Sequence, residues 1–171
     1  MTGQTLVPLS QIRDFHTTSM PASDIDSDIG ARTIMGEASG ETFEGKVAVA
    51  WTFRNRVTVD LWGDRKPDWW GECIADVCLK PWQYTCWKDH NAERIKRATL
   101  SDVVFQDCML AMLCVVKGLI PDPTAGSTHY YNPKIIKTPP AWALGRTPAC
   151  IIGNHHFFNG VEPGAPGYRK V

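Results

Sequence analysis

The sequence lacks several patterns that would assign a chemistry directly. It contains no Cys-x-x-Cys pair, no His-Glu-x-x-His and no Gly-x-Ser-x-Gly, so the usual zinc-knuckle, zinc-protease and serine-hydrolase motifs are absent. It also lacks an excess of charge, because 18 basic and 18 acidic residues cancel. The sequence therefore does not predict a protein that binds nucleic acid through a large net positive charge. The longest strongly apolar run, 108–116, is too short for membrane insertion, which takes about 20 residues.

A secretory signal is also not apparent, because residues 1–20 show no basic start followed by an apolar core. Reduced thiols are therefore the default for the six cysteines. Cys73, Cys78, Cys86 and His90 have spacings unlike a standard zinc knuckle, and we expect no metal or other cofactor. The alternative is that two of these three cysteines form a disulfide if the protein reaches an oxidising compartment.

The composition is that of an ordinary globular domain. Of 171 residues, 43% are hydrophobic and 21% are charged, which argues against wholesale disorder. Charge is nevertheless uneven: residues 1–50 carry seven acidic and three basic residues, whereas 123–171 carry one acidic and five basic. This is either ordinary surface variation or an acidic segment that faces a basic one across a cleft.

Local patterns divide the chain into a polar arm (1–22), one domain (23–162) and a tail (163–171). A capping box, Ser-Asp-Ile-Asp, opens a first helix at Ser23, and Gly40 ends it. Four residues share one face of this helix at i, i+3, i+4 and i+7 spacing. They are Ala31, Ile34, Met35 and Ala38.

Two further helices are predicted, over 46–57 with Thr42 as cap and over 103–117 after a capping box at 99–102. The stretch 60–92 reads as loop-rich and holds five of the seven tryptophans. Short strands are expected toward the end of the chain. They cover 129–132, 151–152 and 156–158. The predicted fold class is α+β, mainly helical, with a small strand region toward the C-terminus.

Glu37 is the first candidate for chemistry. It lies in the last turn of the first helix, beside the apolar stripe, where desolvation would raise the pKa of a carboxyl. A carboxylic acid that keeps its proton near neutral pH is what cleavage of a glycosidic bond needs. Gly36 and Gly40 flank it and are expected to let a polymer approach closely. The plain alternative is a solvated glutamate at a helix end.

Aromatic side chains beside amides form the second candidate. Sugar rings have apolar faces that stack on aromatic rings, and their hydroxyls need polar partners. Two segments offer both kinds of group, and the alternative is that their rings only fill the core. The segments are Trp82, Gln83 and Tyr84, and then Tyr130, Tyr131 and Asn132.

Four motifs occur in order between about residues 29 and 158. They are Ala-Arg-Thr-Ile-Met-Gly-Glu-Ala-Ser-Gly-Glu at 31–41, Glu-Gly-Lys-Val-Ala-Val-Ala at 44–50 with Asn-Arg-Val at 55–57, Gln-Tyr-Thr-Cys-Trp at 83–87, and Asp-Pro-Thr-Ala-Gly at 122–126 with His-Tyr-Tyr-Asn-Pro at 129–133. Together they resemble the motifs of the SleB-type cell-wall hydrolases, the spore cortex-lytic family.

The resemblance implies a lysozyme-like fold, peptidoglycan as substrate, and cleavage of its glycan strand by a lytic transglycosylase or muramidase. It also implies that Glu37 is the catalytic acid and that Glu41 is the family's second glutamate. The segments 60–80 and 89–100 are longer than the family pattern, and 60–80 is also richer in tryptophan. A single catalytic domain without an export signal looks more like a bacteriophage endolysin or virion-associated lysin than a spore enzyme. Such a protein would wait in the host cytoplasm for a holin, or travel in the virion.

The leading hypothesis is cleavage of the β-1,4 bond between N-acetylmuramic acid and N-acetylglucosamine by one catalytic glutamate. If Glu41 is a working second carboxylate, a separation of about 5 Å would favour retention and about 6.5–9.5 Å inversion. A first alternative is a zinc-dependent peptidoglycan amidase or peptidase that uses His129, His155 or His156. A second is a non-catalytic glycan-binding module.

Overall fold

The computed structural model describes residues 24–59, 70–88 and 90–161. The arm predicted over 1–22, the predicted capping residue Ser23, the tail over 163–171 and residues 60–69 of the loop-rich stretch lie outside these residues. The described elements run in the order α2 (Asp24–Ala38), α3 (Phe43–Thr58), α4 (Ile74–Leu79), η1 (Thr85–Trp87), α5 (Ala92–Arg97), α6 (Val103–Val116), β1 (His129–Tyr131), η2 (Ala141–Ala143), β2 (Cys150–Ile152) and β3 (His155–Phe158).

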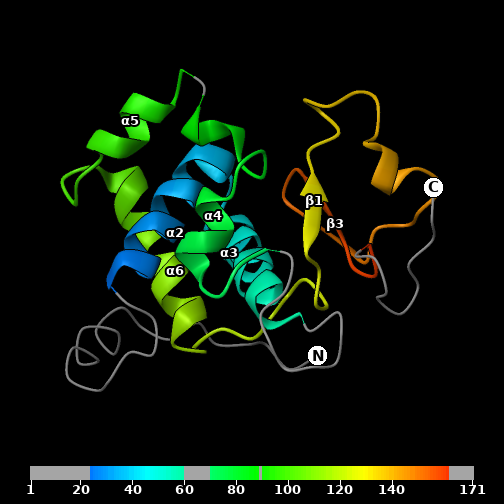
Figure 1. Ribbon diagram of the computed structural model, residues 1–171, viewed down its shortest axis with the longest axis horizontal. Helices are drawn as coiled ribbons and strands as arrows, with labels where there is room; N and C mark the ends of the chain where they lie inside the picture. Colours follow the sequence, from blue (N-terminus) through cyan, green and yellow to red (C-terminus); the bar gives the residue numbers. More distant parts are fainter. Residues whose placement is uncertain (1–23, 60–69, 89, 162–171) are drawn as a thin grey trace.

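The helices gather into one lobe, and the strands lie beside it (Figure 1). Helix α2 packs against α3, α4 and α6, and the four residues of its predicted apolar stripe are all buried. Helix α3 is buried nearly all round, as its sequence predicts. In the described residues, no helix is long and apolar enough to cross a membrane. The core of the molecule therefore lies in the helical lobe.

The helix boundaries agree with most of the predicted caps. The Thr42 hydroxyl accepts a hydrogen bond from the Gly45 amide at 3.3 Å, and α3 starts at the next residue. The capping box predicted at 99–102 is wrong in detail. Asp102 itself is the N-cap of α6, and its carboxylate accepts from the amides of Val104 and Phe105 at 2.8 and 3.3 Å.

Two short helices were not predicted, because six residues are too few to show a helical period. Helix α4 falls inside the stretch that reads as loop-rich, and it buries Ile74 and Val77. Helix α5 ends against the Arg32 guanidinium, which donates to the carbonyls of Ile95, Lys96 and Ala98 at 2.5–3.2 Å. A side chain distant in sequence therefore satisfies the end of this helix.

The second lobe is built on a three-stranded antiparallel sheet of order β1-β3-β2. Tyr130 pairs with Phe157, and His156 lies between Tyr131 and Ile151 in the register. The strands confirm the three predicted segments to within one residue. His155 is buried and His156 is half-buried, as expected for neighbours that point to opposite faces of a strand.

A buried arginine joins the two lobes. The Arg56 guanidinium, near the end of α3, donates to the Thr128 carbonyl at 2.7 Å, just before β1. Asn55 beside it donates to the Asp122 carboxylate at 2.9 Å and to the Ser127 carbonyl at 3.0 Å. The Asn-Arg pair at the end of α3 therefore fixes where the strand region starts.

The expectation that both glycines beside Glu37 give room to a polymer is wrong for Gly36. A Cβ at this position would come within 2.4 Å of the Cys86 Cβ, so Gly36 lets α2 pack closely against η1. Gly40 is exposed, and a Cβ there would meet nothing within 4 Å. The two glycines thus have different structural roles.

Candidate active site

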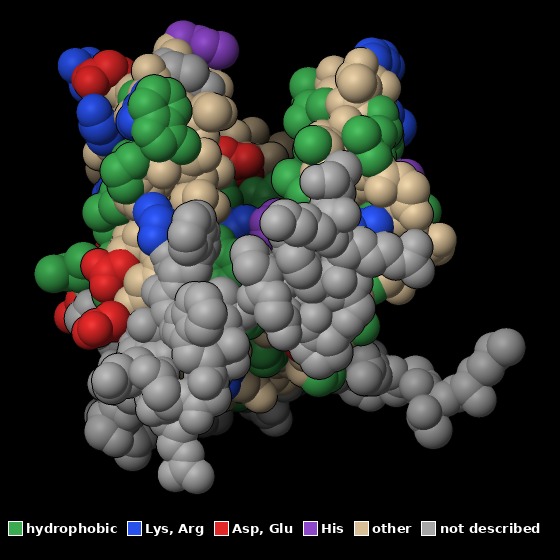
Figure 2. All heavy atoms as spheres, turned by 45° about the vertical axis from the view of Figure 1, so that its right-hand side comes forward, with side chains coloured by type: hydrophobic (Ala, Val, Ile, Leu, Met, Phe, Trp, Pro, Cys, Tyr) green, Lys and Arg blue, Asp and Glu red, His purple; other side chains and the backbone are tan. Residues whose placement is uncertain are grey.

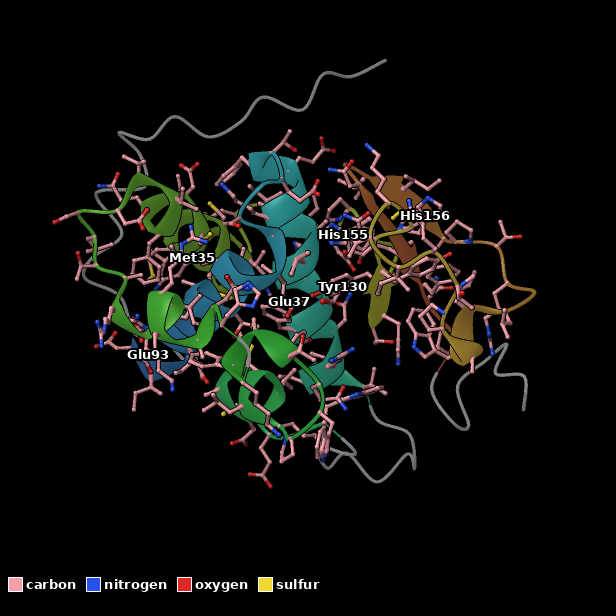
Figure 3. The ribbon with its side chains drawn as sticks, turned by 90° about the horizontal axis from the view of Figure 1, so that it is seen from above. Met35, Glu37, Glu93, Tyr130, His155 and His156 are labelled. Carbon is pink, nitrogen blue, oxygen red and sulfur yellow. The ribbon has the colours of Figure 1, made fainter. Side chains whose placement is uncertain are left out.

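Glu37 lies in the last turn of α2, at the boundary between the two lobes. Its residue is half-buried, while Met35 and Ala38 on the same helix are buried. Figure 3 shows Glu37 directed toward Tyr130 of β1. The Tyr130 hydroxyl donates a hydrogen bond of 3.3 Å to Oε2 of Glu37. The structure therefore brings together two predicted site residues that are 93 positions apart.

The surface between the two lobes is hollowed. Figure 2 shows this groove open to solvent, with acidic side-chain atoms at its floor and hydrophobic side chains along its walls. Glu37 is neither sealed in the core nor fully exposed. A carboxyl in this setting is accessible to a large substrate and is partly shielded from water, which suits an acid–base group.

Tyr130 is a hydrogen-bond donor at any ordinary pH. Burial raises the pKa of Tyr130 well above 10.0, and the negative charge of Glu37 raises it further. Its ring packs edge-on against His155, with centroids 5.1 Å apart, and contacts Phe157 at 5.7 Å. The hydroxyl that orients Glu37 is thus held on a ring packed against β3.

Glu41 follows α2, in the turn before α3, and its side chain is only 6% exposed. Its Oε2 accepts from the Asn154 amide at 3.0 Å, and its Oε1 accepts from the Asn154 side chain at 2.8 Å. Asn154 lies in the turn between β2 and β3. The second candidate glutamate is therefore bound to the strand lobe.

The segment at 82–84 has one exposed and two engaged side chains. Trp82 is 84% exposed, has a positive φ of 69°, and lies under the Lys88 ammonium, 4.1 Å from the ring centroid. Oε1 of Gln83 accepts from Arg56 at 3.1 Å. The buried Tyr84 hydroxyl accepts from the same guanidinium at 2.8 Å. Of the three, Trp82 alone presents an exposed aromatic ring, and the Lys88 ammonium lies over one of its faces.

Tyr131 and Asn132 shape the loop after β1. The half-buried Tyr131 ring stacks on Phe158, with centroids 5.8 Å apart and an interplanar angle of 18°. Oδ1 of Asn132 accepts from the Lys134 amide at 2.9 Å. Their assignment to substrate binding stays a prediction, as does that of Gln83 and Tyr84.

Arg56 is the site-related residue whose role sequence reasoning missed. It is buried, and besides its hydrogen bonds its guanidinium lies over the rings of Trp70 and Tyr84, 5.5 and 5.3 Å from their centroids. An arginine that follows the buried apolar run of α3 is the signal that would have found it. A buried charge of this kind needs several partners, and the structure supplies them.

The histidines of the zinc alternative do not converge. His129 lies between Trp70 and Trp142, at centroid distances of 5.9 and 5.0 Å, and burial lowers the pKa of His129 to about 3. His155 and His156 point to opposite faces of β3. In the part of the chain that the structure describes, no three His, Cys, Asp or Glu side chains are grouped as a metal requires. None of the six cysteines, all of which lie in the described residues, forms a disulfide.

Comparison with known proteins decides the family. The sequence pattern of the family described as Cell Wall Hydrolase matches residues 40–158, well over half of the chain. The chain belongs to the cell wall hydrolase family. This confirms the resemblance of its motifs, although the matched range begins just after Glu37.

Two curated members resemble this cell wall hydrolase across most of its length. The spore cortex-lytic enzyme of Halalkalibacterium halodurans is 30% identical over 149 residues, which are 83% of this chain and 38% of that protein. The spore cortex-lytic enzyme of Bacillus subtilis is 28% identical over 147 residues, 85% of this chain and 42% of that protein. The chain therefore spans about two fifths of the length of these relatives.

Two solved structures share the fold of this hydrolase. The catalytic domain of the Bacillus cereus SleB protein superposes with a TM-score of 0.61 at 25% identity, covering 92% of this chain and 98% of that one. The catalytic domain of the germination-specific lytic transglycosylase SleB from Bacillus anthracis gives 0.62 at 25% identity, with coverages of 83% and 100%. The predicted fold class, α+β and mainly helical with a small C-terminal sheet, is confirmed.

Proposed function

We propose that this cell wall hydrolase cleaves the glycan strand of peptidoglycan, at the β-1,4 bond between N-acetylmuramic acid and N-acetylglucosamine. Glu37 is the catalytic carboxyl. The observation that carries the proposal is the pairing of Glu37 with Tyr130 at the boundary between the two lobes. One structural neighbour is the catalytic domain of a lytic transglycosylase, which supports the same reaction class.

In the proposed first step, the Glu37 carboxyl gives its proton to the glycosidic oxygen. The bond from the muramic acid C1 to that oxygen breaks, and an oxocarbenium-like centre develops at C1. In the second step, the oxygen of the muramic acid 6-hydroxyl attacks C1, and the Glu37 carboxylate takes the proton of that hydroxyl. The product is a 1,6-anhydro sugar. One carboxyl is enough, because the attacking hydroxyl belongs to the substrate and is already placed near C1.

A Glu37→Gln variant tests the proposal. The amide has no acidic proton to give, so the rate of muropeptide release should fall by at least about a hundredfold, while binding to purified sacculi persists. Glu93→Gln is the matched control, because Glu93 is an exposed glutamate of α5 that pairs with its helix neighbours Lys96 and Arg97. Figure 3 shows it on the far side of the helical lobe from Glu37. Unchanged lysis by folded Glu37→Gln would remove the proposed function.

Mass spectrometry of the digest tests the chemical outcome. Anhydro-muropeptides are expected, because the internal hydroxyl competes with water. Reducing-end products alone would overturn the transglycosylase version and leave a muramidase. Loss of activity in a chelator, with stoichiometric zinc in the protein, would instead favour the amidase alternative. Binding without any lysis would favour the glycan-binding module.

Trp82 is the proposed stacking platform for a sugar ring. The Trp82 side chain is exposed, so its indole ring lies away from the core. Its positive φ is strained for a non-glycine residue, and such strain occurs at functional sites. Trp82→Ala should raise KM several-fold and leave kcat nearly unchanged, since the ring would act on binding alone. Leu79→Ala, also exposed and nearby in sequence, is the control.

Delivery to the wall is a separate proposal. We propose synthesis in a host cytoplasm, with release by a holin or carriage in a virion, as for a bacteriophage endolysin or virion-associated lysin. Fractionation of cells that express the chain alone tests this. Appearance outside the inner membrane without a holin would contradict it.

A further inference from the structure

The contact between Glu41 and the β2–β3 turn is unusually close. Both carboxylate oxygens accept hydrogen bonds from one residue, Asn154, through its backbone and its side chain. The residue before it, Gly153, has a φ of +59°, and a Cβ there would come within 2.1 Å of Oε2 of Glu41. The positive φ favours glycine at this position, and the absence of a Cβ leaves room for the carboxylate against the turn.

The next residue connects this contact to the proposed catalytic carboxyl. His155 is 4% exposed, and its Nδ1 lies 3.6 Å from Oε1 of Glu41, beyond hydrogen-bond distance. Burial lowers the pKa of His155, and the Glu41 charge only partly opposes this, so the ring is neutral near pH 7. The ring meets Tyr130 edge-on, and Tyr130 donates to Glu37. Figure 3 shows Glu37, Tyr130 and His155 following one another across the boundary between the lobes.

From this geometry we infer that Glu41 is a positioning residue, not a second catalytic carboxylate. It holds the β2–β3 turn so that β3 supports the Tyr130 ring, and Tyr130 in turn orients Glu37. A nucleophile or general base must present an oxygen to the reacting atoms. Both Glu41 oxygens are instead engaged by Asn154 within a side chain that is 6% exposed. The inference rests on the proposed role of Glu37.

A Glu41→Gln variant separates the two roles. Glutamine keeps the shape of the side chain. Its oxygen can accept from the Asn154 amide, and its NH2 can donate to Oδ1 of Asn154 once that side-chain amide turns over. A positioning residue therefore tolerates the change, and kcat should stay within about tenfold of the parent with an unchanged pH profile. A catalytic carboxylate would lose about a hundredfold or more. Such a loss in a variant with native circular dichroism would overturn the inference.

A double-mutant cycle between Asn154→Ala and Tyr130→Phe gives a second test that leaves Glu41 chemically intact. Asn154→Ala removes one of the two hydrogen bonds to Glu41, and kcat should fall about three- to fivefold. In the Tyr130→Phe background the same change should cost almost nothing, because the hydroxyl that it positions is gone. Equal losses in both backgrounds would show that Asn154 and Glu41 do not act through Tyr130, and would overturn the inference.

The outcomes for the two glutamates distinguish the two proposals. An active Glu37→Gln variant would remove the proposed function, whatever Glu41 does. An inactive Glu37→Gln variant together with an equally inactive, folded Glu41→Gln variant would keep the proposed function and would make Glu41 part of the chemistry. The inference expects an inactive Glu37→Gln variant and an active Glu41→Gln variant.

Discussion

Tyr130 supplies one hydrogen bond to Glu37, and Tyr130→Phe isolates that bond because the ring contacts with His155 and Phe157 remain. The expected result is a fall in kcat of about tenfold, since one net hydrogen bond to a charged group contributes about 1.5 kcal/mol. Rates of muropeptide release check this. Tyr131→Phe is the control for kcat, because that ring stacks on Phe158 and any part it takes in substrate binding would change KM instead. Equal losses in both variants would show that the hydroxyl near Glu37 has no special role.

His129 makes the fold sensitive to acid. Burial, with the nearby charges of Arg56 and Arg146, lowers the pKa of His129 from 6.5 to about 3. Between these two values the unfolded chain binds more protons than the folded one. Stability is therefore complete above about pH 6.5 and decreases as the pH falls toward 3. Over that range the loss from this group should be roughly 1–3 kcal/mol.

A His129→Phe variant checks the acid sensitivity, because phenylalanine keeps an aromatic ring between Trp70 and Trp142 and removes the titration. Thermal unfolding between about pH 7 and pH 4 should then show a smaller fall in Tm than the parent shows. His156→Phe, at the half-buried histidine paired with Tyr131 in the sheet, is the control. If the two variants had the same pH dependence as the parent, His129 would not be the group responsible. Part of the dependence of Tm on pH should remain in the His129→Phe variant, because burial also lowers the pKa of His155.

Single residues differ in how far local spacing can predict them. The place of Glu37 beside an apolar stripe follows from the helical period, which uses only neighbouring residues. Its partner Tyr130 is 93 positions away, and Asn154 is 113 positions from Glu41. No local pattern encodes such pairs. The sequence could therefore suggest Glu41 through resemblance, but it could not show that the strand lobe binds its carboxylate.

At the scale of elements, the contact between α2 and η1 depends on Gly36. A methyl group there meets the Cβ and Sγ of Cys86 at 2.4 and 2.7 Å, so Gly36→Ala forces the two elements apart. The expected cost is about 1–3 kcal/mol, the usual range for overpacking. Thermal unfolding measures it. Gly40→Ala should change stability by less than about 0.5 kcal/mol, because its Cβ meets nothing within 4 Å. Equal effects would contradict the packing role of Gly36.

The start of α6 provides a second element-scale prediction. Asp102 accepts from two backbone amides, so Asp102→Ala should lower the free energy of unfolding by about 1 kcal/mol. Thr99 accepts from the exposed Ser101 amide, at 3.3 Å, and Thr99→Ala should be nearly neutral. Urea unfolding of both variants checks this. If Thr99→Ala lowered the free energy of unfolding more than Asp102→Ala does, Thr99 would be the N-cap, as the sequence pattern predicts.

The elements that the sequence predicts are those that carry their own signal. Helices α2, α3 and α6 have 14 to 16 residues, long enough to show both period and caps. Helices α4 and α5 have six residues each and owe their stability to tertiary contacts, such as the Arg32 bonds at the end of α5. The short strands were recognisable from aromatic and β-branched runs, although their order in the sheet was not.

At the scale of the whole molecule, the groove depends on how the two lobes are joined. Arg56 donates across the junction to the Thr128 carbonyl, and Asn55 donates to Asp122 and to the Ser127 carbonyl. These bonds connect the end of α3 to the chain that enters β1. Sequence patterns establish both lobes, but their relative placement is a matter of long-range polar contacts. The position of Glu37 at the groove was for this reason beyond sequence reasoning.

The strand lobe, residues 123–161, carries three cationic side chains and no aspartate or glutamate. They are Lys134, Lys137 and Arg146. Because the stem peptides of peptidoglycan carry carboxylates, binding to sacculi should weaken as salt rises, and Lys134→Gln with Lys137→Gln should reduce both affinity and salt dependence. Pull-down assays between about 50 and 500 mM salt measure this.

Lys96→Gln with Arg97→Gln removes the same amount of positive charge from α5, where both cations already pair with Glu93, and is the matched control. Its binding should stay close to that of the parent, because these cations lie on the helical lobe. If both double variants lost affinity for sacculi equally, the net charge of the protein, and not the position of the lysines, would determine its binding. A loss confined to Lys134→Gln with Lys137→Gln would instead assign the anionic part of the substrate to the strand side of the groove.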